Sequence, residues 1–222
     1  MRILITAGNT QTPIDQVRVI TNVFSGRTGA RVAAEAAARG HRVTLLTSHP
    51  DTLDPAAGVM VRPYRTFDDL ERLMAGELRA GGCDAVVHAA AVSDYHVAGA
   101  LARQGGELVD VTAGKISGRH PGLWLRLVPA PKLVDKVRGE WGFGGVLVKF
   151  KLEVGATDAE LRAVAERSRV QSGADLMCAN TLEGMHDWAD LGAGLDYRRV
   201  ARPALAGALV EAVERLARRI GS

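Results

Sequence analysis

The chain has 222 residues, of which 47% are hydrophobic and 24% charged, a composition that is typical of a globular protein and excludes a disordered one. Its formal net charge is only +3 and no run of five or more basic residues occurs, so we expect no nucleic-acid partner. No stretch approaches the roughly 18 apolar residues that cross a bilayer, and the N-terminus opens on a strand pattern rather than on a signal peptide. We therefore expect a cytoplasmic protein with no membrane partner. The two cysteines are too few for a disulfide scaffold.

The first half of the chain alternates short apolar strands with helices. Apolar runs bounded by turn residues predict strands at residues 1–6, 42–47, 59–63 and 84–88, and helical periodicity predicts helices at 26–39 and 67–80. Gly40 follows the first helix and is expected to cap its C-terminus. This alternation is typical of a parallel sheet that helices cover on both faces.

The second half repeats the pattern less regularly. Strands are expected at 123–127, 145–150 and 174–178, and helices at 129–139, 157–171 and 205–220. Thr157 is expected to cap the second of these helices, because Glu160 follows three residues later and completes a capping box. Residues 93–120 and 181–202 are expected to be irregular, and their length is typical of a binding loop, a flap or an arm. The predicted fold is a single doubly wound α/β domain over residues 1–222, Rossmann-like, with a mainly parallel sheet, helices on both faces and a flap or arm.

Small residues gather where the predicted strands end. In an open parallel sheet, ligands bind beyond the carboxyl ends of the strands, near the point where the strand order reverses. Gly8 follows the first strand, residues 25–29 (Ser-Gly-Arg-Thr-Gly) open the first helix, and residues 89–94 (Ala-Ala-Ala-Val-Ser-Asp) follow the fourth strand. The N–H groups at a helix N-terminus attract phosphate, and glycine lets a phosphate approach the backbone. The pattern therefore favours a nucleotide or another phosphorylated ligand.

A nicotinamide-dependent dehydrogenase is the first alternative, and the residues disfavour it. Its fingerprint is G-x-G-x-x-G directly after the first strand, with an acidic residue about 20 positions further on. Gly8 has no glycine at the next-but-one position, and the second strand ends in residues 47–49 (Thr-Ser-His) without a carboxylate. Tyr95 is followed four residues later by Gly99 rather than by lysine, so a tyrosine–lysine proton relay is not offered. A Walker-type phosphate loop is absent as well.

Several motifs, in their order and spacing, resemble the phosphopantothenate–cysteine ligase (phosphopantothenoylcysteine synthetase) family, and the short length is closest to its stand-alone members. The motifs are residues 3–8 (ILITAG), 13–15 (PID), 17–22 (VRVITN), 25–29 (SGRTG), 89–95 (AAAVSDY), 115–117 (KIS), 129–134 (PAPKLV), 149–152 (KFKL) and 173–180 (GADLMCAN). The resemblance runs from residue 3 to about residue 185. Separate motifs that agree in register make a chance match a poor explanation.

This resemblance implies a two-step ligation in coenzyme A biosynthesis. The carboxylate of 4′-phosphopantothenate attacks the α-phosphate of a nucleotide, CTP in bacterial members or else ATP, and gives an acyl-nucleotide and pyrophosphate. The amine of cysteine then attacks the activated carbonyl and releases the nucleoside monophosphate. Such chemistry depends on positioning and on charge neutralisation. Mg²⁺ is expected to accompany the nucleotide without a metal-binding motif in the protein, and the family suggests a homodimer.

The resemblance also implies roles for individual residues. Asn22 is expected to contact the acyl-nucleotide, and Lys115, on a mobile loop, is expected to neutralise phosphate charge. The other expected nucleotide contacts are Gly8, Ser25, Gly26 and Gly29 around the phosphates, Ala90, Ala91 and Asp94 along the base and ribose, Pro131 and Phe150 in the pocket wall, and Arg167 and Asn180 beside it.

Some positions depart from the family pattern. Phe24 stands where the family has a serine that holds phosphate, and a phenyl ring cannot donate a hydrogen bond. Asn9 replaces a second glycine. Two lysines of the family align with Arg167 and Gln171, of which only Arg167 keeps the charge, while Lys149 stands where glycine is common and can compensate for lost charge. These changes leave an alternative open, namely a nucleotide-binding protein of the same fold that acts on another carboxylate or has no ligase turnover.

Overall fold

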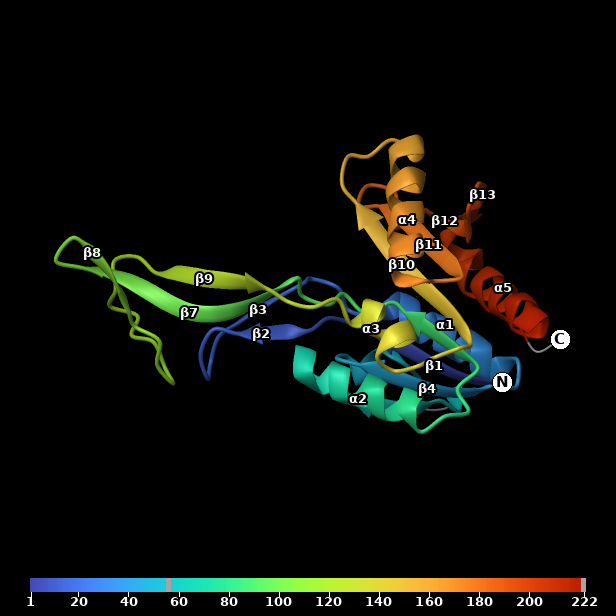
Figure 1. Ribbon diagram of the computed structural model, residues 1–222, viewed down its shortest axis with the longest axis horizontal. Coiled ribbons are helices and arrows are strands. Elements are labelled where there is room, and N and C mark those ends of the chain that lie inside the picture. The colour runs from blue at the N-terminus through green and yellow to red at the C-terminus, as the bar shows by residue number, and fades with distance from the viewer. Residues whose placement is uncertain (55–56, 221–222) are drawn as a thin grey trace.

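The computed structural model describes residues 1–54 and 57–220, which form an eight-stranded sheet and a projecting arm (Figure 1). The strands of the sheet follow the order β13-β12-β11-β10-β6-β1-β4-β5. Their bounds are Arg2–Ala7 for β1, Arg42–Thr47 for β4, Met60–Pro63 for β5, Ala85–His88 for β6, Val146–Glu153 for β10, Leu176–Thr181 for β11, Trp188–Ala193 for β12 and Asp196–Ala201 for β13. The neighbouring strands β5, β4, β1, β6, β10 and β11 run parallel to one another. Strands β12 and β13 are antiparallel to their neighbours. The strand order reverses between β1 and β6, so the predicted doubly wound, mainly parallel sheet is confirmed.

Helices cover both faces of this sheet. Their bounds are Arg27–Ala38 for α1, Phe67–Arg79 for α2, Leu133–Gly139 for α3, Asp158–Ser172 for α4 and Leu205–Ile220 for α5, and short 3₁₀ turns lie at Pro50–Thr52 and Arg202–Ala204. Val87 of β6 is buried with residues of α1 and α5, whereas its neighbour Val86 is buried with residues of α2 and α3. Helix α4 packs through Leu161 against Met177 of β11. Strands that are buried on both faces are apolar throughout, which is why short apolar runs predicted them.

Local hydrogen bonds set the start of two helices. In the capping box of α4, the N–H of Thr157 donates to Glu160 Oε2 (2.9 Å), and the N–H of Glu160 donates to Thr157 Oγ1 (3.4 Å), as the sequence predicted. Thr66 and Asp69 form the same box at the start of α2. Gly40 follows α1 with a φ of +83°, a left-handed backbone that ends a helix.

The two stretches that were expected to be irregular contain β-hairpins, so that expectation was wrong. Residues 93–120 include β7 (Tyr95–Gln104) and β8 (Glu107–Asp110), and residues 181–202 include β12 and β13. The strand expected at 123–127 is β9 (Trp124–Pro129), which pairs with β7 in a separate three-stranded sheet. Side chains of β8 and β9 are mostly exposed on both faces. Such strands lack the alternation of buried and exposed positions by which a sequence indicates a strand.

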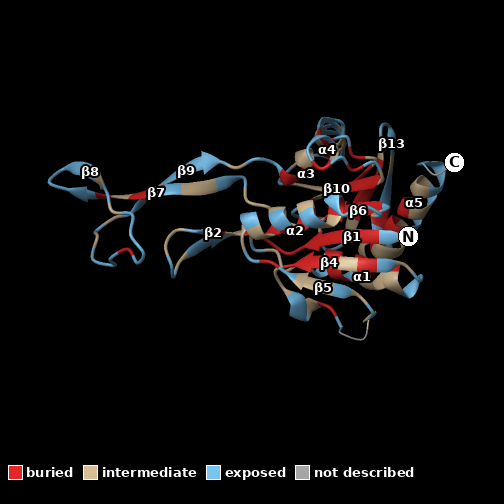
Figure 2. Cartoon of the chain, turned by 60° about the horizontal axis from the view of Figure 1, so that its bottom comes forward, coloured by how far each residue is buried: buried red, intermediate tan, exposed pale blue. Residues whose placement is uncertain are grey.

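The three-stranded sheet forms an arm that projects from the α/β core (Figures 1 and 2). We define the arm as β7, β8, β9, the loop between β8 and β9, and the adjacent hairpin of β2 (Gln11–Pro13) and β3 (Val19–Thr21). Ala100, Ala102 and Ile116 are buried within it. Large apolar residues that stay exposed on the arm are Val17, Val19, Ile20, Tyr95, Leu108, Leu123, Trp124, Leu127 and Val128. The described residues contain no helix that is long and apolar enough to span a membrane.

Candidate active site at the strand ends

Gly26 and Gly29 let the start of α1 rest on the end of β1, and Gly8 lets the end of β1 approach Ser48, which follows β4. Gly26, the N-cap of α1, has a φ of +78°, and a Cβ there would lie 2.5 Å from the backbone nitrogen of Gly8. A Cβ on Gly8 would lie 2.2 Å from Ser48 Oγ, and one on Gly29 would lie 2.5 Å from Ala7 Cβ. Glycine is required at position 26 both by the backbone conformation and by this contact. No side chain caps the first turn of α1, so its N–H groups remain available to an anion.

Asn22 and Ala91 meet beside this turn. The Nδ2 group of Asn22 donates to the carbonyl oxygen of Ala91 (3.2 Å), and the N–H of Ala91 donates to the carbonyl oxygen of Gly8 (2.8 Å). Asn9, which replaces a family glycine, is buried and donates through Nδ2 to the carbonyl oxygen of Asn22. The N–H of Ala90 donates to Thr6 Oγ1 (3.2 Å). The structure thus brings together Gly8, Asn22, Gly26, Gly29, Ala90 and Ala91, all of them predicted site residues, with Ser25 directly before the N-cap.

Asp94 lies after β6 and forms an ion pair with Lys132, which precedes α3. Both side chains are more than half exposed, at 62% and 56%, so the pair adds little stability and can yield to a ligand. The N–H of Ala130 donates to the carbonyl oxygen of Asp94 (2.8 Å), which places Pro131 beside the pair. Sequence reasoning assigned no role to Lys132, because a lysine in a loop carries no sign of its partner.

A row of polar side chains crosses the ends of β1, β6 and β10 on one face of the sheet. Thr6 Oγ1 and His88 Nδ1 lie 2.9 Å apart, and His88 pairs in register with Lys149. The Nζ of Lys149 donates to the carbonyl oxygen of Ser168 (3.1 Å) and to Ser172 Oγ (3.3 Å), both on α4. Burial, and then the charge of Lys149, lowers the pKa of His88 to about 4, so this imidazole is neutral at pH 7. Burial also lowers the pKa of Lys149.

Asp135, in the first turn of α3, lies close to this row. Its Oδ2 accepts a hydrogen bond from Gln171 Nε2 (3.1 Å). The negative charge of Asp135 raises the pKa of Lys149 and so opposes the larger effect of burial, which lowers it. Its Oδ1 is buried and has no hydrogen-bond partner among the described residues. Gln171, at a position where the resemblance implies a lysine, is therefore bonded to α3. Lys149 of β10 brings a positive charge to α4, because its ammonium contacts Ser168 and Ser172 of that helix.

Phe150 and Asn180 lie on neighbouring strands, β10 and β11. Phe150 packs against the core on the face of α1 and α5, opposite to the face of Lys149. Asn180 pairs in register with Leu152 near the carboxyl end of β11. In the order of the sheet, the strands of these two predicted residues follow β6 on the side opposite to β1.

Lys115 belongs to the arm. Its neighbours Gly114 and Ile116 form hydrogen bonds with Gln16 and Asp15, in the turn between β2 and β3. Among the described residues, no hydrogen bond or ion pair joins the Lys115 side chain to the strand ends. The two residues expected to be catalytic therefore lie in different parts of the structure, Asn22 beside the strand ends and Lys115 on the arm.

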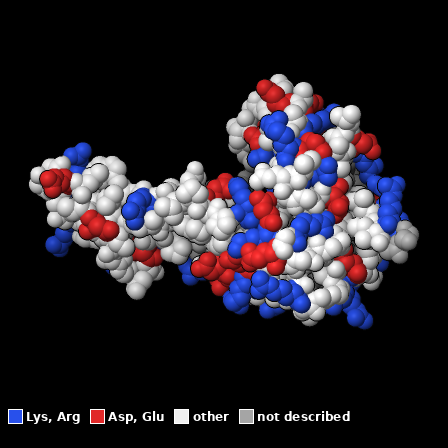
Figure 3. All heavy atoms as spheres, viewed as in Figure 1, with Lys and Arg blue, Asp and Glu red and all other residues white. Residues whose placement is uncertain are grey.

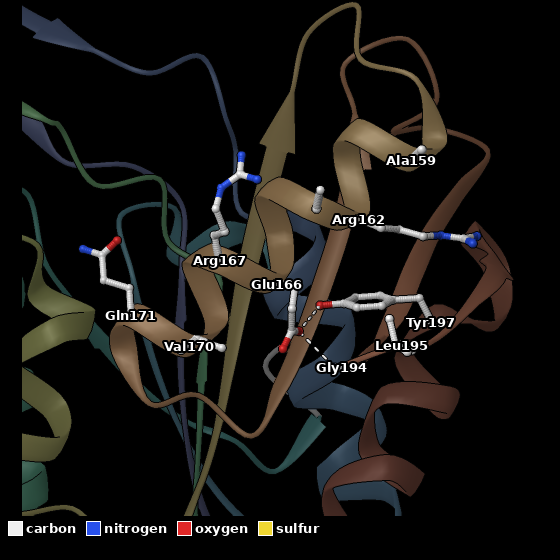
Figure 4. Close-up of a pocket in the computed structure, with 10 residues that line it drawn as sticks. Ala159, Arg162, Glu166, Arg167, Val170, Gln171, Gly194, Leu195 and Tyr197 are labelled. Carbon is white, nitrogen blue, oxygen red and sulfur yellow. Dashed lines mark hydrogen bonds between the residues drawn. The ribbon is translucent and has the colours of Figure 1, made fainter.

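A cleft of ≈ 700 Å³ lies between α4 and the β12–β13 hairpin (Figure 4). Glu166 within it accepts hydrogen bonds from Arg169, from Tyr197 Oη (3.1 Å) and from the N–H of Gly194 (2.9 Å), and Arg169 chiefly holds the pKa of Glu166 at about 2. Arg167 lines the cleft and points in a different direction from Glu166 (Figure 4). Glu166, Arg162 and Gln171 of the cleft are each paired within the protein. We place the site at the strand ends, where the N–H groups that open α1 have no side-chain cap.

Metal-ligating side chains do not gather in the described parts of the chain. No group of three or more His, Cys, Asp or Glu residues there could hold a metal ion. The arrangement at the strand ends instead offers N–H donors, one side-chain amide and the ammonium groups of Lys132 and Lys149. Such a set is suited to a polyanion.

Comparison with known proteins gives a consistent result. A family model described as the DNA/pantothenate metabolism flavoprotein C-terminal domain matches residues 1–190. The coenzyme A biosynthesis bifunctional protein CoaBC of Thermococcus kodakarensis is 38% identical over 185 residues, which cover 82% of this chain and 41% of that protein. CoaBC of Mycobacterium tuberculosis is 32% identical over 195 residues, which cover 82% of this chain and 42% of that protein. The chain thus spans less than half the length of the curated relatives it matches.

Solved structures agree with the fold. The DNA/pantothenate metabolism flavoprotein from Streptococcus pneumoniae has a TM-score of 0.83 and 26% identity, and the match covers 97% of this chain and 99% of that one. A Cab2 mutant in complex with phosphopantothenate-cysteine has a TM-score of 0.75 over 99% of this chain and 87% of that one, and at 16% identity this likeness shows the fold alone. The family match over residues 1–190 and the strand order together show that the chain belongs to the family of DNA/pantothenate metabolism flavoprotein C-terminal domains.

Proposed function

We propose that the chain is a phosphopantothenate–cysteine ligase of coenzyme A biosynthesis. The names of its CoaBC relatives and the motifs along the chain support this proposal. Its substrates are 4′-phosphopantothenate, cysteine and a nucleoside triphosphate, with CTP expected before ATP. The observation that carries the proposal is the Asn22 amide, which is held at the end of β6 beside the uncapped start of α1.

In the first proposed step, a carboxylate oxygen of 4′-phosphopantothenate bonds to the α-phosphorus of the nucleotide. The bond from that phosphorus to the bridging oxygen of the β-phosphate breaks, and pyrophosphate leaves. The N–H groups of the first turn of α1 stabilise charge on the phosphate oxygens. Lys132 and Lys149 add positive charge on the side of β6 and β10.

In the second proposed step, the amine of cysteine bonds to the acyl carbon, the bond from this carbon to the phosphate oxygen breaks, and the nucleoside monophosphate leaves. The amine loses one proton to solvent. Asn22 Nδ2 carries two N–H groups, and one of them donates to Ala91 and fixes the amide. The second is free to donate to the oxyanion that develops on the carbonyl.

Mg²⁺ accompanies the nucleotide in this proposal and neutralises phosphate charge. Asp94, the carboxylate among the predicted site residues, is paired with Lys132, and the described residues hold no cluster of metal-ligating side chains. Phosphate oxygens and water would therefore supply most of its ligands.

We also propose that the protein is a homodimer that associates through the arm. On the arm, Tyr95, Trp124, Leu127 and Val128 are between 39% and 50% exposed, and Figure 3 shows charged side chains more thinly spread over the arm than over the core. These residues lie on both faces of the projecting sheet. Large apolar residues that stay exposed on one projecting element are typical of an interaction site. Sedimentation velocity of the wild type should report a dimer, and Leu127→Lys should shift it to a monomer. A monomeric wild type would contradict this part of the proposal.

Pyrophosphate release tests the ligase. We expect release that requires 4′-phosphopantothenate, with a cysteine-coupled product identified by mass spectrometry, in separate reactions with CTP and with ATP. If nucleotide binds and neither reaction releases pyrophosphate, the alternative holds, namely a protein of this fold that acts on another carboxylate or has no turnover. Two residues favour that alternative, namely Phe24, where the resemblance implies a phosphate-binding serine, and Gln171, where it implies a lysine.

A further inference from the structure

A carboxylate is fully covered at the turn between β2 and β3. The side chain of Asp15 is 0% exposed, although the turn lies on the projecting arm. Its Oδ1 accepts hydrogen bonds from the N–H groups of Val17 and Arg18, each 2.8 Å long. Its Oδ2 accepts a third, 3.1 Å long, from the N–H of Ile116, a residue 101 positions further along the chain. The carboxylate therefore closes its own turn and also holds a distant loop.

Arg18 completes this link. Its Nη1 lies 3.1 Å from Asp15 Oδ2, and its Nη2 donates to the carbonyl oxygen of Ile116 (3.1 Å). Both backbone groups of Ile116 are thus bonded to the β2–β3 turn, and its side chain is buried, with 1% exposed. Hydrogen bonds to ionised groups are stronger than neutral ones, so this anchor is stronger than an ordinary turn contact.

The residue on the other side of Lys115 is held as well. The N–H of Gln16 donates to the carbonyl oxygen of Gly114 (2.9 Å). A Cβ on Gly114 would lie 3.2 Å from the Gln16 side-chain nitrogen, so the two segments are in close contact. Gly114 and Ile116 flank Lys115, and both are tied to the same turn while Lys115 itself is exposed. The backbone of Lys115 is therefore held at both neighbours, and its ammonium is left for a ligand.

We propose that Asp15 is a positioning residue for Lys115, whose ammonium it presents to the phosphates of the nucleotide by fixing the backbone on either side. The inference rests on the proposed function, because it takes the ligand of Lys115 to be a nucleotide. Holding the backbone in advance reduces the conformational entropy that binding must remove. The three N–H donors, that of Val17 foremost, lower the pKa of Asp15, so the carboxylate stays ionised at neutral pH.

A double-mutant cycle distinguishes positioning from a general structural effect. Its members are the wild type, Asp15→Asn, Lys115→Gln and the double variant, and its readout is the Kd for CTP with Mg²⁺, which does not require turnover. Asp110→Asn is the matched control, because Asp110 accepts an N–H from Thr112 on the same arm without contacting the 114–117 loop. We expect each single variant to weaken CTP binding about tenfold and the double variant to be no more than about twofold weaker than Lys115→Gln. The control should stay within about twofold of the wild type.

Losses that multiply in the double variant would overturn the inference, as would CTP binding that does not depend on Lys115. Hydrogen exchange gives an independent readout. The amide of Ile116 should exchange faster in Asp15→Asn than in Asp110→Asn, and equal protection in both would also overturn it. If CTP binds with the expected coupling and the wild type makes no cysteine-coupled product, the proposed ligase fails and the positioning role stands.

Discussion

The side-chain amide of Asn22 donates a 3.2 Å hydrogen bond to the backbone carbonyl oxygen of Ala91, 69 residues further along the chain. This bond ties the segment after β3 to the end of β6, at the point where the order of the parallel strands reverses. A side-chain amide that is fixed through one N–H keeps the second in a defined direction.

Asn22→Asp should lower kcat for pyrophosphate release and for product formation about 10²-fold, because a carboxylate cannot donate and repels the developing oxyanion. The change keeps the size of the side chain. Gln104→Glu, an exposed amide at the β7–β8 turn, is the matched control and should leave kcat unchanged. A kcat of Asn22→Asp within about threefold of the wild type would contradict a catalytic role for this amide.

Gly26→Ala should lower the free energy of unfolding by about 2 to 5 kcal/mol, since a left-handed backbone disfavours Ala and a new Cβ would collide with the Gly8 backbone. Gly142→Ala is the control, because Gly142 has a φ of +64° and open space around it. Gly142→Ala should lower the free energy of unfolding by about 1 to 2 kcal/mol, because only the backbone conformation disfavours Ala there. Urea denaturation measures both, and equal losses would show that the contact with Gly8 contributes nothing.

Lys149→Met should weaken nucleotide binding about tenfold, since it removes a partly buried positive charge beside α4 and keeps most of the side-chain volume. Lys151→Met is matched to it, because Lys151 lies two residues further along the same strand and pairs with Glu153. Equilibrium titration with CTP compares the two variants. If both bind CTP as the wild type does, the compensating role of Lys149 is wrong.

His88 should make the protein less stable in mild acid. Its folded pKa of about 4 lies below the ordinary value of 6.5, so between these pH values the unfolded chain binds more protons and stability rises with pH. The contribution should be complete above about pH 6.5 and should fall by up to about 3 kcal/mol as the pH approaches 4.

Urea unfolding at a series of pH values, compared between the wild type and His88→Gln, isolates this contribution from that of the carboxylates. The wild type should lose more stability than the variant between pH 6.5 and pH 4, the two pKa values involved. Parallel curves would show that His88 is not buried in the neutral form.

The parallel strands of the main sheet and the helices that cover them could be predicted from local sequence. The strand at 42–47 and the helix at 205–220 have the predicted bounds, because an apolar strand buried on both faces and a strongly amphipathic helix are each apparent within one window. The hairpins β7–β8 and β12–β13 were missed. Their pairing depends on a partner strand rather than on alternation within one segment.

The sequence by itself determined the fold class, the family motifs and the small residues at the strand ends, since each depends on residue types at fixed short spacings. Only the tertiary structure decided which distant residues meet. It joined Asn22 to Ala91, Lys149 to α4, and Asp15 to the loop of Lys115. It also paired Asp94 with Lys132. Each of these contacts links segments from 19 to 101 residues apart, and their meeting depends on the path of the whole chain through the sheet.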